Sequence, residues 1–130
     1  MSPSNTGLAN YAQASAVTAS PHEVVRMAFE RILTACARAE AAEQGRNASW
    51  LQTFHDETVR AQAILVELSA GLSLQHPDRE VVDLAERLDS LYRYVITQLA
   101  QANMHKSSGP LQAVRMVVDG LRDAWASNPP

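Results

Sequence analysis

Four stretches of the sequence repeat apolar residues every three or four positions, and short polar segments separate them. This spacing places the apolar side chains along one face of an α-helix, and none of the four stretches alternates as a half-buried strand does. Each helix must bury its stripe, and short connections favour antiparallel neighbours. The pattern therefore predicts an all-α protein, an antiparallel up-down four-helix bundle with a short N-terminal arm or helix.

Capping residues and helix breakers predict the ends of the first two helices. Residues 20–23 read Ser-Pro-His-Glu, so that Ser20 is expected to cap a helix that begins at Pro21. The polar segment 44–47 should end this helix. The second helix is expected to start at Ser49, with Gln52 completing a capping box, and to run to about residue 70.

The third and fourth helices follow a loop at residues 71–77. Asp78 is expected to be the N-cap of the third helix, and residues 106–110 contain Ser, Gly and Pro, which should end it. The fourth helix is expected from Leu111 to the polar end at 127–130. The third stripe is the longest and resembles a heptad pattern: it contains Val81, Ala85, Leu88, Tyr92, Val95, Leu99 and Ala102.

The first residues differ in composition from the rest of the chain. Residues 1–20 are rich in Ser, Asn, Thr and Gly, with Leu8, Tyr11 and Val17 as the larger apolar groups. We expect a mobile N-terminal arm over 1–20 and the four-helix bundle over 21–130.

Charge and composition argue against several classes of function. The net charge of -3 gives no broad attraction for nucleic acid or an anionic membrane. No apolar run is long enough to span a bilayer, and the N-terminus lacks the features of a signal peptide, so we expect no membrane insertion and a cytoplasmic location. Cys36 is the single cysteine, lies on the stripe of the first helix, and is expected to be a buried, inert hydrophobe.

No motif predicts a metal, a cofactor or a catalytic group. The four histidines show no metal-binding spacing, and the dispersed glycines form no phosphate loop, so we expect no metal and no cofactor. His55 is followed by Asp56 and Glu57, as in a histidine phosphotransfer bundle, which leaves that function as an alternative. Apart from that alternative, we expect no enzymatic activity.

Several segments together resemble the flagellar secretion chaperone family. They are Asn10 with Tyr11, residues 17–21 and 24–30, residues 88–94, Leu99, residues 102–103, and the closing 121–125. The order and spacing are similar to the family over nearly the whole chain. The resemblance implies a bundle that binds the disordered C-terminal segment of flagellin, prevents premature polymerisation, and assists delivery to a component of the flagellar type III export gate.

The same resemblance suggests where a partner binds. Tyr11 resembles the family's N-terminal tyrosine, so that the arm either shields the binding groove or staples onto the bundle end. Met27 lies off the main stripe of its helix, where a partner contact and extra core packing are both open. Tyr94 lies about 200° around the helix from Tyr92, which makes Tyr94 the contact candidate and Tyr92 a packing residue.

The residues predicted to bind a partner are Leu8, Tyr11, Val17, Met27, Leu91, Tyr94 and Asn103. For Asn103, capping of the turn after the third helix is the simpler alternative. Self-association through exposed apolar residues such as Val66, Leu84 or Ile96, including a homodimer, also stays open.

Overall fold

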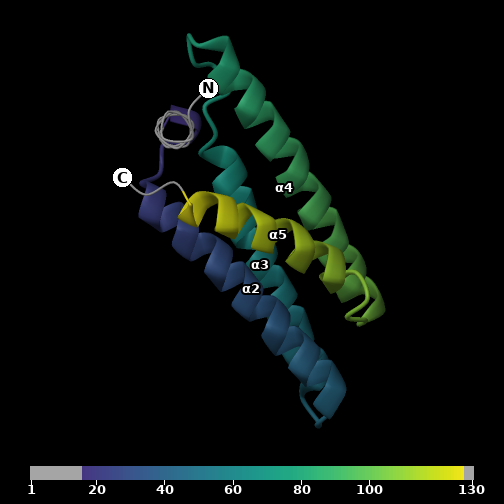
Figure 1. Ribbon diagram of the computed structural model, residues 1–130. Coiled ribbons are helices and arrows are strands. Elements are labelled where there is room, and N and C mark those ends of the chain that lie inside the picture. The colour runs from purple at the N-terminus through teal and green to yellow at the C-terminus, as the bar shows by residue number, and fades with distance from the viewer. Residues whose placement is uncertain (1–15, 128–130) are drawn as a thin grey trace.

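The computed structural model describes residues 16–127, which contain four α-helices (Figure 1). They are α2 (His22–Gly45), α3 (Trp50–Ala70), α4 (Arg79–His105) and α5 (Leu111–Ala126). Each apolar stretch of the sequence forms one helix. The all-α prediction is therefore confirmed for this part of the chain.

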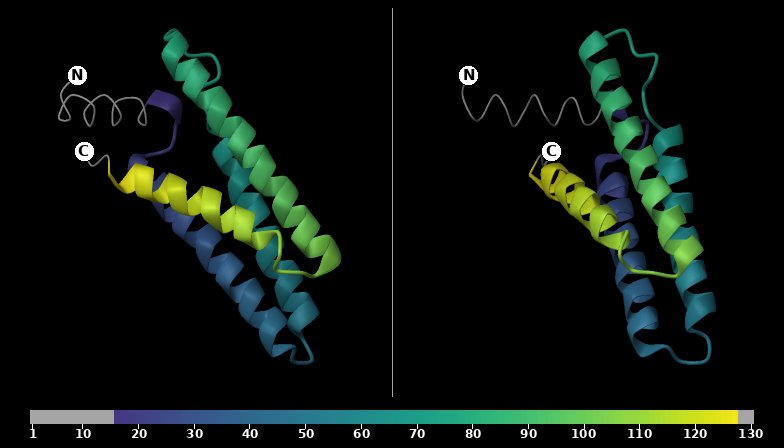
Figure 2. Two further views of the ribbon diagram at one scale, coloured as in Figure 1. Left: turned by 45° about the vertical axis from the view of Figure 1, so that its right-hand side comes forward. Right: turned by 90° about the vertical axis from the view of Figure 1, so that its right-hand side faces the viewer.

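The helices form the predicted antiparallel bundle. α2 packs against α3 and α5, and α4 also packs against α3 and α5, so that the four helices surround one core. Figures 1 and 2 show that α2, α3 and α4 run side by side, whereas α5 lies obliquely between α2 and α4. The oblique course of α5 is a feature that the sequence pattern did not predict.

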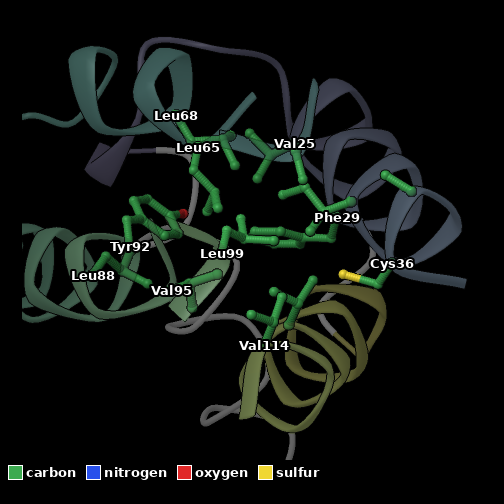
Figure 3. Close-up of a cluster of buried hydrophobic side chains, with 14 of the residues drawn as sticks. Val25, Phe29, Cys36, Leu65, Leu68, Leu88, Tyr92, Val95, Leu99 and Val114 are labelled. Carbon is green, nitrogen blue, oxygen red and sulfur yellow. The ribbon is translucent and has the colours of Figure 1, made fainter. Parts of the chain in front are cut away.

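The core is one cluster of side chains from all four helices, and Figure 3 shows part of it. The ring of Phe29 lies 6.5 Å from that of Tyr92, and it meets the ring of Trp125 edge-on at 5.7 Å. Aliphatic residues make up most of the remaining cluster. All seven residues of the predicted third stripe are buried, which confirms that α4 faces the core with this side.

A mutual contact joins the end of α5 to the start of α2. The ring of His22 stacks on that of Trp125 at a centroid distance of 5.4 Å. Trp125 Nε1 donates a hydrogen bond to the carbonyl oxygen of His22 at 3.1 Å, and His22 Nε2 lies 2.9 Å from the carbonyl oxygen of Trp125. These contacts hold the oblique helix against the first one.

Of the predicted helix caps, only that of α4 is confirmed. Asp78 is the N-cap residue, and its side chain accepts a hydrogen bond from the amide of Glu80 at 2.9 Å. The predicted breaks at 44–47, 71–77 and 106–110 all separate helices. These three predictions are therefore confirmed. The helices end there because each segment contains residues that favour turns over helix.

The side-chain caps predicted at Ser20 and Ser49 do not form, although Ser49 does precede α3 as its N-cap residue. α2 begins at His22 and not at Pro21, and its N-cap residue Pro21 makes no side-chain cap. Ser20 lies in residues 16–20, whose backbone is hydrogen-bonded to the loop that follows α3. Ser49 is the N-cap residue of α3, but its hydroxyl donates to Asn47 Oδ1 at 3.2 Å, and Gln52 bonds Asp56 instead of completing the capping box.

Residues 16–20 pack against the loop that follows α3. The amide of Ala19 donates to the carbonyl oxygen of Gly71 at 3.0 Å, and the amide of Ser73 donates to that of Val17 at 2.7 Å. Thr18 and Leu72 form an isolated antiparallel bridge. This end of the predicted arm is therefore attached to the bundle, while Leu8 and Tyr11 lie outside the described residues.

Candidate functional site

A groove runs between α2 and α3, and one half of it is mainly apolar. Val24, Met27, Ala28 and Ile64 line a hollow of about 300 Å³, together with Arg31 and Glu67. Positions 24, 27, 28 and 31 share one face of α2, because residues three and four apart are neighbours on a helix. This face lies beside the core stripe, which leaves Val24 and Met27 exposed at the edge of the bundle.

The other half of the same groove is charged. Arg31 and Ile64 continue into a second hollow of about 390 Å³, which is also lined by Thr34, Ala35, Arg38, Glu57 and Arg60. Three arginines thus face one carboxylate. We call the two hollows together the α2–α3 groove.

Glu57 is an unusual residue in this groove because it is a buried acid. Only 6% of its surface is exposed. Its Oε1 lies 3.7 Å from Arg60 Nε and 4.0 Å from Arg38 Nη1, whereas Oε2 has no hydrogen-bond partner within the described part of the chain. Buried charges normally have close partners. Glu57 therefore carries an acceptor oxygen that no group in residues 16–127 satisfies.

A second groove lies between α3 and α4. Val66 and Ile96 supply its apolar part, and Ser69, Asp89, Arg93 and Thr97 complete a hollow of about 430 Å³. Arg93 Nε donates to Asp89 Oδ2 at 2.8 Å, so the two charges in this groove pair with each other. The α3–α4 groove therefore combines a small apolar part with charged residues that neutralise each other.

The predicted site residues fall into separate parts of the structure. Met27 is 42% exposed and lines the α2–α3 groove. Leu91 and Tyr94 are exposed on α4 and line neither groove. Val17 is fully buried in the core, so in this conformation it packs and offers no surface to a partner. The structure does not gather these residues into one patch.

Asn103 joins two helices in place of forming a simple cap. Its Nδ2 lies 3.1 Å from Nδ1 of His55 on α3, and its Oδ1 accepts from Lys106 Nζ at 2.8 Å. α4 continues past Asn103 to His105, and Lys106 in a left-handed conformation ends it. His55 is exposed, but the amide of Asn103 already occupies one of its ring nitrogens.

Cys36 is buried, as the sequence pattern predicted. Figure 3 shows its sulfur in the core beside Val114 of α5. Burial raises the pKa of the Cys36 thiol to about 12, and the nearby carboxylate of Glu40 adds to the shift. The thiol is therefore protonated at neutral pH and inert as a nucleophile.

The described residues offer neither a metal site nor a membrane-spanning helix. Within 16–127, no group of three His, Cys, Asp or Glu side chains is placed to hold a metal ion. None of the described helices combines the length and the apolar character needed to cross a membrane.

Sequence reasoning missed the charged half of the α2–α3 groove. The sequence pattern did not single out Arg31 or Arg38, and it marked Glu57 only as an acidic neighbour of His55. A signal was present, since residues 24, 27, 31, 34 and 38 form a second stripe along the first helix. The residue that faces this stripe could not be found without the packing of α3.

The fold and its grooves define the class of this protein: a four-helix bundle with apolar grooves open between neighbouring helices. Grooves of this kind accept amphipathic helices in many proteins. Residues 4–129 match the family described as "Flagellar protein FliS". The chain therefore belongs to the FliS family.

Relatives from three bacteria agree with this assignment. The chain is 30% identical to the flagellar secretion chaperone FliS of Campylobacter jejuni over 115 residues, which cover 88% of this chain and 84% of the relative. It is 28% identical to the protein of the same name from Vibrio cholerae over 112 residues, covering 86% and 77%. The Bacillus subtilis protein is 28% identical over 115 residues, covering 88% and 80%.

Proposed function

We propose that this chain is a cytoplasmic export chaperone that binds the disordered C-terminal segment of flagellin. Binding would prevent premature polymerisation and assist delivery of the client to a component of the flagellar type III export gate. Membership of the FliS family carries the proposal, because the relatives are named flagellar secretion chaperones. The α2–α3 groove supports it, because it offers exposed apolar side chains beside a rigid core.

The groove suits a client that folds as it binds. A disordered segment with an apolar helical face gains stability by covering Val24, Met27 and Ile64, which line the groove. Met27 is well suited to such a contact because its flexible thioether adapts to different partner side chains. Shallow grooves give many modest contacts, and this allows the client to be released for export.

The remaining predicted contacts extend this proposal beyond the groove. Leu91 and Tyr94 would contact the client or the export gate from the exposed side of α4. Leu8 and Tyr11 would shield the binding surface when no client is present. Val17 can join them only if residues 16–20 leave the loop that they pair with. Asn103 would support the surface by holding α3 to α4.

Titration calorimetry tests the proposal with the full chain and a peptide covering the C-terminal segment of flagellin from the same organism. We expect a one-to-one complex with a large negative heat-capacity change, because apolar surface is buried and the peptide folds. No heat at several temperatures, together with no co-elution of chain and peptide, would refute flagellin binding.

Two methionines provide a matched pair of variants for locating the contact. Met27 and Met116 are both exposed, but only Met27 lines the α2–α3 groove. Met27→Gln should weaken peptide binding about fivefold or more because it removes apolar contact, while Met116→Gln should leave the affinity unchanged. Equal effects of the two substitutions would place the client elsewhere on the chain.

A further inference from the structure

We propose that the α2–α3 groove binds a carboxylate of its partner. The occupant would be an amphipathic helix with aliphatic side chains at one end and an acidic residue at the other. The aliphatic end would lie over Val24 and Met27, and the acidic group would bind among Arg31, Arg38 and Arg60. This inference rests on the proposed function, because it takes the client segment of flagellin as the occupant.

The distribution of charge in the groove supports an acidic occupant. The chain as a whole carries a net charge of -3, yet the charged hollow is lined by three arginines and one carboxylate, and Glu67 lines the apolar hollow. Arg26, on the same helix, is neutralised by Glu23 and Glu30, whereas Arg31 makes no ion pair within residues 16–127. An unneutralised guanidinium beside an apolar hollow favours a partner that brings a carboxylate.

The position of Glu57 adds a second observation. Its Oε1 lies within ion-pair distance of Arg38 and Arg60, so that it holds two of the three guanidinium groups at the groove. Its Oε2 is buried and has no hydrogen-bond partner among residues 16–127. Glu57 is therefore a positioning residue for these two guanidinium groups.

The length of the groove fits a helix. Val24 and Arg38 are separated by fourteen residues of α2, which span about 21 Å, or roughly four helical turns. Val24 and Met27 lie toward one end of this span and Arg38 at the other, with Arg31 between them in both hollows. The α3–α4 groove has no comparable polarity, because its arginine pairs with Asp89. The α2–α3 groove can therefore fix the direction in which an amphipathic helix lies.

Charge reversal at Arg31 tests the proposal, with Arg79→Glu as the control. Arg31 makes no ion pair within residues 16–127, so that its reversal should spare the fold. Arg79 is an exposed arginine on α4, outside the groove, that pairs with Asp83 on its own helix. We expect Arg31→Glu to weaken binding of the flagellin C-terminal peptide about tenfold and Arg79→Glu to change it less than about twofold. Circular dichroism melting curves would verify that both variants fold.

A modified peptide identifies the group that Arg31 binds. Changing every Asp and Glu of the peptide to Asn and Gln should weaken its binding to the unmodified chain, and Arg31→Glu should then cost nothing further. The unmodified pair should also lose affinity as salt is raised, because exposed charges are screened. Arg31→Glu should reduce that dependence on salt.

The outcomes separate this inference from the proposed function. No binding of the peptide to the unmodified chain would refute flagellin binding itself. Tight binding that is equal for the unmodified chain and Arg31→Glu, with the same dependence on salt, would refute the carboxylate site and leave the chaperone function standing. Self-association in sedimentation that Arg31→Glu abolishes would assign the groove to a second copy of the chain and overturn the proposal.

Discussion

Tyr92 and Tyr94 lie two residues apart on α4, but 1% and 46% of their respective surfaces are exposed. Tyr92→Ala removes a ring that packs beside Phe29 in the core. An aromatic side chain buries about 150–250 Å², which at ~25 cal/mol/Å² corresponds to about 4–6 kcal/mol of transfer free energy. Measured aromatic-to-alanine losses in cores are about 3–5 kcal/mol, so we expect a loss of about 4 kcal/mol. Tyr94→Ala should cost less than about 1 kcal/mol.

Urea unfolding followed by circular dichroism would measure both free energies. With a denaturant slope of about 2 kcal/mol/M, Tyr92→Ala should lower the midpoint by about 2 M, and Tyr94→Ala by less than about 0.5 M. Tyr92→Phe keeps the ring and should retain most of the stability. Equal shifts for the two alanine variants, or a larger one for Tyr94→Ala, would mean that α4 is rotated differently and that the assignment of its faces is wrong.

Three further predictions concern buried and exposed polar groups. Burial raises the pKa of Cys36 to about 12, so the thiol of the folded protein should resist alkylation at pH 8 and should react after urea unfolding. Because the thiol loses its proton at a lower pH in the unfolded chain than in the folded one, the free energy of unfolding should also fall as pH rises above 9. Val17→Asp should release residues 16–20 and speed hydrogen exchange of the Ser73 amide more than tenfold, since that amide donates to Val17. His55→Gln should keep peptide affinity within about twofold; retained affinity with lost export would favour the phosphotransfer alternative.

The fold was largely predictable because the features that define each helix lie within its own segment of the sequence. The apolar residues of α4 recur with helical spacing, and all seven are buried. Asp78 caps α4 with its own side chain, which needs only local geometry. The polar loops at 44–47 and 106–110 end helices through residues that favour turns. These features depend on neighbours in sequence, so that the sequence shows them directly.

Ser20 and Ser49 do not cap helices because other contacts, one tertiary and one local, involve these residues or their segments. Ser20 belongs to residues 16–20, whose backbone pairs with the loop 71–73, and this pairing joins positions more than fifty residues apart. The hydroxyl of Ser49 donates to Asn47 Oδ1 within the loop after α2, where Arg46 has a left-handed backbone conformation. Such alternatives cost little locally, so only the packed structure decides among them.

The sequence alone determined four helices, their core faces and the family resemblance, because periodicity and short motifs are local properties of the chain. Only the tertiary structure decided the α2–α3 groove, because Arg31 and Arg38 meet Glu57 and Arg60 across two helices. It also decided that Val17 is core and that Asn103 joins α3 to α4. Contacts of this kind follow from how helices rotate and cross when they pack, and one helical stripe does not specify the residues that will face it.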